Sequence, residues 1–275
     1  MSSISDQNYL LSSQYKTAAN LNARIRLHEL YSTNKYGWFR WLFDQFDLPT
    51  RAAILEVGCG PGTLWVENLA RVPEGWDVTL TDLSPGMVEE ARANLQGTKR
   101  GFSFRQADAM SLPYPDASFD AVLAMYMLYH VPDRNKALAE MSRVLRPDGT
   151  LYVATLGRMH MYELYELLHR FDAQAAARLP FGPASPDALE HRLGFVLETA
   201  GDELARHFSQ LSLLRYEDAL EVTEAAPLVD YILSSSGSVF DQEQTEALTA
   251  FIQAELDAKG HIHIRKDNGL FVARK

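Results

Sequence analysis

The chain has 275 residues, of which 47% are hydrophobic and 23% are charged, as in an ordinary globular protein. A formal net charge of -10 disfavours a nucleic-acid backbone or an anionic membrane as partner, and residues 121–131, the longest nearly uncharged apolar run, fall short of the roughly 20 residues that span a bilayer. A single cysteine, Cys59, excludes an internal disulfide, and the first residues lack a secretory signal, so we expect a cytoplasmic protein that binds neither nucleic acid nor membranes.

The N-terminal residues 1–50 are aromatic and polar, and no strand is evident in them. Leu21, Ile25 and His28 follow helical spacing. Aromatic and basic side chains cluster over residues 15–41 on an otherwise acidic protein, and we therefore expect residues 1–50 to form a helical lid over the ligand site.

The middle of the chain, residues 51–157, alternates short apolar runs with segments of helical spacing, which is typical of βα units and a parallel sheet. The expected buried strands are 52–57, 77–82, 119–125 and 150–156, and 102–108 alternates like a more exposed strand. Between the last two buried strands, Asp133 is placed to cap a helix that carries Leu138, Met141 and Leu145 on one face.

The residue pattern after position 157 predicts a helical insertion followed by further strands and helices. Within an insertion over residues 158–206, apolar residues follow helical spacing from 159 to 177, and prolines and a glycine break the pattern at 178–186. Nearer the C-terminus we expect a helix that ends at Gly260 and then a β-hairpin turning at Asn268-Gly269.

The glycine loop that follows the first strand predicts a site for a small polar ligand. Gly58, Gly60 and Gly62 are spaced GxGxG, whereas the nicotinamide fingerprint is GxGxxG. Glu56 precedes the loop, where a carboxylate repels a pyrophosphate and suits an ammonium group. Asp82 ends the second strand, 20 residues after Gly62, and is placed to bind both hydroxyls of a ribose. An amine and a ribose without phosphate describe S-adenosylmethionine.

Four stretches in this order resemble the class I S-adenosylmethionine-dependent methyltransferases, and within them the type 11 subgroup that includes the ubiquinone and menaquinone methyltransferases. They are "ILEVGCGPG", "LTDLSPGMVEEAR", "RQADAMSLPYPDASFDAVLAMYMLYHVPD" and "EMSRVLRPDGTLYVAT". The resemblance implies a Rossmann-like α/β fold with a mostly parallel seven-stranded sheet and helices on both faces. Residues 51–157 would be its core, and 207–275 would complete the sheet.

The resemblance also implies roles for particular residues. Glu56 would lie near the methionyl ammonium, the glycines would admit the methionine part and ribose, and Asp82 would hold the ribose. The cofactor-binding residues implied are Glu56, Gly58, Cys59, Gly60, Gly62, Asp82, Leu83, Met87, Asp108, Ala109 and Met125. S-adenosylhomocysteine would be the product.

Structural alternatives stay open for several of these residues. Asp82 also suits a helix cap, Glu56 a buried ion pair and Asp108 a surface turn. Cys59 suits packing better than nucleophilic chemistry, because a catalytic thiol needs an electropositive setting beside a base, and Met87 and Met125 suit a core as well as a cofactor pocket.

The acceptor side is less defined by the sequence. A general base is needed only when the acceptor loses a proton, and His130 is the candidate because it lies just beyond the fourth buried strand; a structural histidine is the alternative. Candidate substrate-binding residues are Tyr15, His28, Tyr31, Tyr126 and Tyr162. The strand end "AMYM" lacks the motif with which many nucleobase and amide methyltransferases hold an amino group, and no residues have metal-ligand spacing, so we expect no metal.

The sequence therefore predicts direct in-line methyl transfer to a small-molecule acceptor. Two other classes remain possible: a nicotinamide-dependent oxidoreductase, if the glycine loop is misread, and a non-catalytic scaffold that binds S-adenosylmethionine. The sequence does not specify the acceptor or the oligomeric state.

Overall fold

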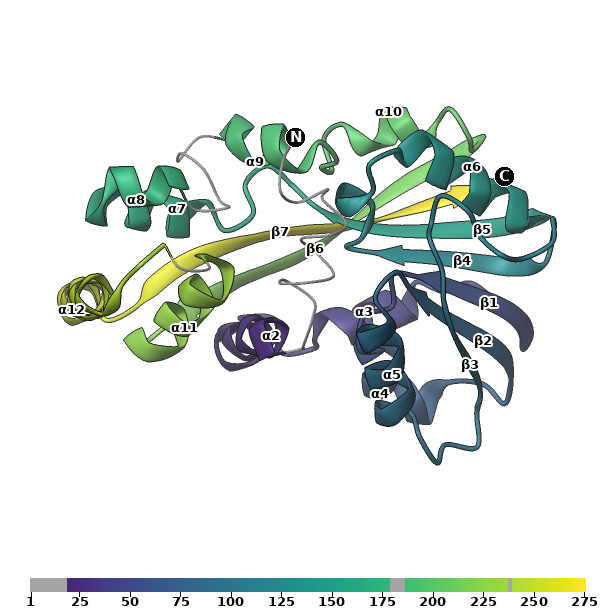
Figure 1. The fold of residues 1–275 in the computed structure, drawn as a ribbon, viewed down its shortest axis with the longest axis horizontal. Coiled ribbons are helices and arrows are strands. Elements are labelled where there is room, and N and C mark those ends of the chain that lie inside the picture. The colour runs from purple at the N-terminus through teal and green to yellow at the C-terminus, as the bar shows by residue number, and fades with distance from the viewer. Residues whose placement is uncertain (1–18, 179–185, 237–238) are drawn as a thin grey trace.

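The architecture is a seven-stranded sheet flanked by helices, seen in a computed structural model that describes residues 19–178, 186–236 and 239–275 (Figure 1). The strand order is β3-β2-β1-β4-β5-β7-β6. β1 to β5 are parallel, and β7 runs antiparallel to both β5 and β6. The bounds are β1 Arg51–Val57, β2 Gly75–Asp82, β3 Gly101–Gln106, β4 Phe119–Met125, β5 Leu145–Leu156, β6 Gln210–Val222 and β7 Ile262–Arg274. The Rossmann-like, mostly parallel sheet expected from the sequence is confirmed.

Helices cover both faces of the parallel part of the sheet. On one face α3 (Trp38–Asp44), α4 (Thr63–Asn68) and α5 (Pro85–Asn94) pack on β1, β2 and β4. On the other face lie α6 (Arg134–Val144) and α10 (Ala200–Leu204). Continuous apolar strands such as "AILEV" are explained by this burial from both sides, while β3 is more exposed because it is an edge strand.

The predicted cap of the α6 helix is present. The Asp133 carboxylate accepts the Lys136 N–H at 2.9 Å, and Leu138 and Met141 are buried. The helix ends at Val144, so Leu145 begins β5 instead of completing the helical face.

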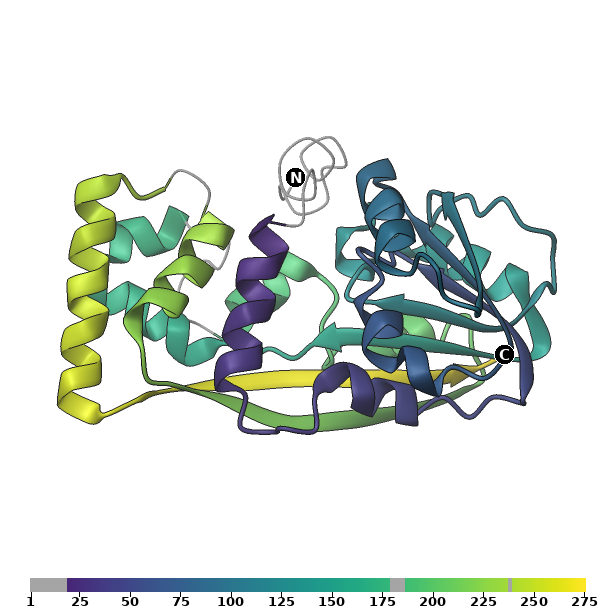
Figure 2. The same cartoon turned by 90° about the horizontal axis from the view of Figure 1, so that it is seen from below.

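A second core surrounds the far half of the β6–β7 ribbon. β5 pairs with β7 only over Asn268–Arg274, so the remainder of the ribbon extends beyond the sheet. Five of the described helices pack there: α2 (Ala19–Tyr31), α7 (Tyr162–Phe171), α8 (Ala173–Arg178), α11 (Ala225–Ser236) and α12 (Gln242–Lys259). Figures 1 and 2 show α7, α8, α11 and α12 of this helical lobe at the opposite end of the molecule from β1 to β3, with α2 on the side of the lobe nearer to those strands. α9 (Pro186–Leu193) lies on the chain between α8 and α10.

The hairpin predicted at Asn268-Gly269 is wrong. β7 runs without a turn through both residues, with Asn268 opposite Leu156 on β5 and Tyr216 on β6. Glycine at position 269 gives close packing, because a Cβ there would lie 2.8 Å from Leu197 Cδ2 and that side chain would have to shift. The predicted helix end at Gly260 is confirmed, since α12 ends at Lys259 and Gly260 adopts φ 80°.

The other predictions for the flanking segments have mixed outcomes. Helical structure in the N-terminal segment and over 159–177 is confirmed by α2, α7 and α8. The break predicted at 178–186 falls mainly on residues 179–185, outside the described residues. No described helix is long and apolar enough to cross a membrane.

Candidate functional site

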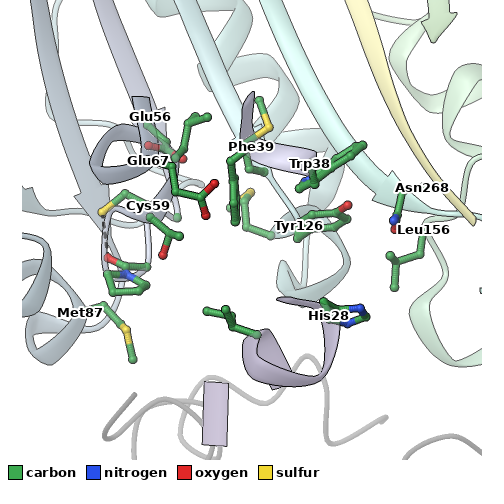
Figure 3. Close-up of a pocket in the computed structure, with 18 of the residues that line it drawn as sticks. His28, Trp38, Phe39, Glu56, Cys59, Glu67, Met87, Tyr126, Leu156 and Asn268 are labelled. Atoms are coloured by element: carbon green, nitrogen blue, oxygen red, sulfur yellow. Dashed lines mark hydrogen bonds between the residues drawn. The ribbon is translucent and has the colours of Figure 1, made fainter. Parts of the chain in front are cut away.

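A cavity of about 700 Å³ opens at the carboxyl ends of β1, β2 and β4. The cavity continues past α2 and α3 to the carboxyl end of β5 and to β7, so that it lies between the parallel sheet and the helical lobe. Figure 3 shows Glu56, Cys59 and Met87 on one side of the cavity, and Leu156 and Asn268 on the other. Sites that bury a ligand of drug size have volumes of roughly 300–1,000 Å³.

The glycine loop between β1 and α4 is fixed from two sides. The Cys59 N–H donates to the Thr81 carbonyl at 2.9 Å, and the Gly60 N–H donates to Asp82 Oδ2 at 3.0 Å. Gly58 has φ 72°, and a Cβ there would lie 2.7 Å from Met127 Cβ, so only glycine fits. A Cβ at Gly60 would meet nothing within 4 Å, so this turn leaves room for a ligand beside its backbone.

Glu56 is a buried carboxyl at the start of the loop. It accepts the indole N–H of Trp65 at 2.5 Å, and burial raises its pKa to about 8. Its partner is an indole and not a cation, so the ion-pair alternative is not what the structure contains. The carboxyl has spare acceptor capacity for a ligand group.

Asp82 joins the second strand to the loop. Its two oxygens accept the N–H groups of Gly60 and Ser84, at 3.0 and 2.8 Å. Burial raises the pKa of Asp82, although these backbone hydrogen bonds act in the opposite direction and lower it. The cap of α5 is Ser84, whose hydroxyl accepts the Met87 N–H, so the helix-cap alternative for Asp82 is wrong.

Most of the predicted cofactor residues line this one cavity. Cys59, Leu83, Met87, Asp108, Ala109 and Met125 do so together with Glu56, Gly58, Gly60 and Asp82. The Asp108 carboxylate accepts the Met110 N–H at 2.8 Å, so this residue forms the predicted turn as well as lining the cavity. Burial raises the pKa of the Cys59 thiol well above its ordinary value, which disfavours a nucleophile.

Gly62 is the exception among the predicted cofactor residues. It does not line the cavity and sits at the N-terminus of α4, where a Cβ would contact Ala91 and Leu95 at 3.4 Å. Its place is therefore explained by the turn and by helix packing.

The predicted acceptor residues divide into two groups. His28, Tyr126 and His130 line the cavity, and burial raises the pKa of Tyr126 well above its ordinary value. Tyr31 packs against the core of the helical lobe, and Tyr162 begins α7; neither lines the cavity. Tyr15 lies outside the described residues.

Several lining residues were not predicted individually. The cavity is also lined by Trp38, Phe39, Tyr129, Leu156, His160, Lys266 and Asn268. The aromatic stretch "WFRW" hinted at the first two. No local sequence pattern pointed to His160, Lys266 or Asn268. Only the fold brings β7 and the loop after β5 to the cavity at the glycine loop.

The described residues contain no group of three or more His, Cys, Asp or Glu arranged to hold a metal ion.

Comparisons with known proteins agree with this geometry. Residues 55–153 match the family described as methyltransferase domain. The chain is 43% identical over 110 residues to 27-O-demethylrifamycin SV methyltransferase of Amycolatopsis mediterranei, covering 38% of this chain and 39% of that protein. It is 31% identical over 157 residues to the ubiquinone/menaquinone biosynthesis C-methyltransferase UbiE of Pectobacterium carotovorum, covering 56% and 62%.

A solved structure shows the same fold. Phosphoethanolamine N-methyltransferase 2 of Haemonchus contortus, in complex with S-adenosyl-L-methionine, superposes with a TM-score of 0.58 at 17% identity and covers 98% of this chain and 59% of that one. The matched segments of the two relatives span only 39% and 62% of those proteins' lengths.

Proposed function

We propose that this chain, whose residues 55–153 match the methyltransferase-domain family, is a class I, type 11 methyltransferase that binds S-adenosylmethionine and transfers its methyl group to a small-molecule acceptor. The observation that carries the proposal is the single cavity that joins the glycine loop and its two carboxyls to an aromatic and polar far end. A cofactor and an acceptor can meet in such a cavity away from bulk water.

The residues at the glycine loop fit a ligand with an ammonium group and a ribose. We assign Glu56 to the ammonium and Asp82 to the ribose hydroxyls, because each buried carboxyl keeps unused acceptor positions. A pyrophosphate fits poorly here, since the Gly60 N–H already donates to Asp82 and an ionised Asp82 carboxylate would repel phosphate charge.

The adenine is assigned to the part of the cavity formed by the ends of β2 and β3. Leu83 and Met87 supply apolar contacts there. Asp108 supplies an acceptor, and the Ala109 N–H a donor.

The reaction chemistry comes from the bound cofactor, which supplies a methyl group activated by its sulfonium. The residues of this chain align the acceptor and exclude water. Met125, the last residue of β4, lines the cavity, and Tyr126, which follows it, lies between the glycine loop and the far end of the cavity (Figure 3). His130 is the proposed base for an acceptor that must lose a proton.

Isothermal titration calorimetry with S-adenosylmethionine, S-adenosylhomocysteine and NADH tests this proposal. We expect micromolar binding of the first two and none of NADH. Saturable binding of NADH alone would support the oxidoreductase alternative. Binding of S-adenosylmethionine without S-adenosylhomocysteine formation for any acceptor in a broad screen would favour the non-catalytic scaffold.

A further inference from the structure

Trp65 is a buried tryptophan just after the glycine loop. It lies on α4, its side chain is 0% exposed, and it does not line the cavity. Its ring makes T-shaped contacts with Phe43 on α3 and Phe102 on β3, at centroid distances of 6.4 and 5.8 Å. Rings from two other elements therefore hold the indole in one place, and any effect of Trp65 on a ligand has to pass through a neighbouring side chain.

That neighbour is Glu56. The indole N–H of Trp65 donates to Glu56 Oε2 at 2.5 Å. Oε1 of the same carboxyl makes no hydrogen bond with any described residue, and Glu56 lines the cavity (Figure 3). A buried carboxyl that is held at one oxygen has little freedom to turn, so the bond leaves Oε1 as the atom available to a ligand.

The donor to this carboxyl is neutral, which decides what Glu56 can bind. Burial raises the pKa of Glu56 to about 8, the Trp65 N–H acts against burial and lowers this pKa, and the Asp82 carboxyl raises it. None of these three influences is a cation. A lysine or arginine in place of the indole would neutralise the carboxylate. The indole instead satisfies one oxygen and leaves the negative charge to be compensated by a cationic group of the ligand.

We propose that Trp65 is a positioning residue for the cofactor: its N–H holds the Glu56 carboxyl so that Oε1 receives the cofactor's ammonium group, and the site thereby selects ligands that carry an ammonium there. The proton that Glu56 holds in the ligand-free chain passes to the solvent when the ammonium takes its place. This inference rests on the proposed function, which assigns Glu56 to the ammonium, and adds the residue through which α4 controls that contact.

Two ligands that differ in one group measure this selection: S-adenosylhomocysteine and its deaminated analogue, in which hydrogen replaces the amino group. Both are titrated into the full chain near neutral pH by isothermal titration calorimetry. We expect the wild type to bind S-adenosylhomocysteine at least about tenfold more tightly than the analogue, because the ammonium forms a charge-assisted hydrogen bond with a buried carboxylate.

Trp65→Phe removes the N–H and keeps most of the buried ring surface. It should reduce the ratio of the two affinities at least about fivefold, because the hydrogen bond that it removes is made to a charged group when the cofactor is bound. The affinity for the deaminated analogue should change by less than about twofold. An unchanged ratio would overturn the inference.

Trp76→Phe is the matched control. Trp76 is buried in the same core as Trp65, and its indole N–H donates to the Pro49 carbonyl at 2.9 Å. It also contacts Phe43 and does not line the cavity. The substitution removes an indole hydrogen bond of the same kind away from Glu56, so the affinity ratio should stay at its wild-type value. An equal fall of the ratio in both variants would show that Trp65 acts only through the packing of the core, and would overturn the inference.

A double-mutant cycle separates positioning from packing in a second way. Glu56→Gln should bring the affinity ratio close to one. In that background Trp65→Phe should change the ratio by less than about twofold, because the carboxylate on which Trp65 acts is gone. The same fold-change of the ratio in both backgrounds would contradict the inference.

The indole N–H signal of Trp65 in NMR spectra tests the same contact without a substitution, and so serves even if Trp65→Phe does not fold. Saturation with S-adenosylhomocysteine should shift this signal more than saturation with the deaminated analogue. The reason is that only the ammonium turns the carboxyl that accepts this N–H into a carboxylate. Equal shifts would contradict the inference.

The failure of the proposed function is separately visible. Absence of S-adenosylhomocysteine binding to the wild type contradicts the proposed function, and equal binding of the two ligands to the wild type contradicts the assignment of Glu56 to the ammonium. Either result would overturn the inference as well. Once the wild type has shown the expected preference, the affinity ratios of the variants bear on Trp65 alone.

Discussion

The indole N–H of Trp65 donates a hydrogen bond of 2.5 Å to the carboxyl of Glu56, and both side chains are buried. Trp65 lies on α4 and Glu56 on β1, so this bond ties the helix after the glycine loop to the strand before it. Because the donor is neutral, the carboxyl remains uncompensated when it ionises, and Asp82 adds to the cost.

Glu56 makes the stability of the ligand-free protein depend on pH. The pKa of Glu56 is about 8 in the folded chain, whereas the ordinary pKa of a glutamate, which applies to the unfolded chain, is 4.5. The folded state therefore holds this proton more tightly than the unfolded state does. The contribution is present in full below about pH 4.5 and is lost as the pH rises through about 8. When urea denaturation is measured from pH 5 to 9, the free energy of unfolding of the wild type should fall relative to that of Glu56→Gln by a few kcal/mol, which is the order expected from such a pKa shift. Parallel curves for the two proteins would contradict this assignment.

Asp82 should determine cofactor affinity. Asp82→Ala removes the proposed acceptor for the ribose hydroxyls and the anchor of the Gly60 N–H, and we expect a loss of about 2 kcal/mol or more in the binding of S-adenosylhomocysteine. Calorimetry measures the loss. Asp77→Ala, an exposed aspartate on the same strand, is the control and should bind as wild type does. An unaltered affinity of Asp82→Ala would remove Asp82 from the site.

Helix α2 contributes to the core of the helical lobe as well as to the wall of the cavity, so substitutions on its buried side should destabilise the fold. Leu27 is 0% exposed and Leu30 on the same helix is 47% exposed. Leu27→Ala should lower the free energy of unfolding by about 2–5 kcal/mol, whereas Leu30→Ala should change it by less than about 0.5 kcal/mol. Urea denaturation of the two variants measures this difference, and equal effects would mean that α2 does not pack as described.

This arrangement affects how the lid hypothesis is tested. Deleting residues 1–36 would remove Leu27 from the lobe as well as the lining residues Ile25 and His28. Loss of activity in that deletion would therefore not separate closure over the cofactor from damage to the lobe. A point substitution of a lining residue, such as His28→Leu, separates the two.

The buried pair Lys266–Asp218 should respond asymmetrically to substitution. Asp218 also accepts hydrogen bonds from the Ser32 hydroxyl and the Asn34 N–H, which hold the segment after α2 to β6. Asp218→Ala leaves the Lys266 ammonium buried with Ser32 alone and should cost about 3–5 kcal/mol in urea denaturation. Lys266→Met should cost less, because Asp218 keeps its other donors.

A lysine that is itself mostly exposed supplies the reference for that comparison, in an ion pair whose carboxylate is also bound by Arg170. Lys259 and Glu255 pair across one turn of α12, and Lys259→Met should change stability by less than about 1 kcal/mol. Equal costs for Asp218→Ala and Lys266→Met would show that the neighbouring donors do not stabilise the carboxylate.

Local patterns were sufficient where one strand, its turn and the following helix decide the structure. The run ending at Glu56, the glycine loop and the Asp133 cap were each predicted from a few adjacent residues. They succeeded because burial on both faces imposes continuous apolar strands, and a cap requires its own side chain at one position.

Local patterns failed where distant contacts decide. Asn268-Gly269 has the composition of a turn, yet β7 continues through it because β5 and β6 pair on both sides and Leu197 occupies the space beside Gly269. The place of Gly62 beside Ala91 and Leu95 was likewise not predicted, because the position of α5 is not encoded in the glycine loop itself.

The sequence by itself determined the class of sheet, the glycine loop and the carboxyls at the ends of β1 and β2, because these features depend on residues close together in the chain. Only the tertiary structure decided that His28, His160, Lys266 and Asn268 share a pocket with them. The reason is physical: β7 inserts antiparallel beside β5, and α2 packs on α11, through long-range contacts whose partners are chosen by the packing of the whole chain.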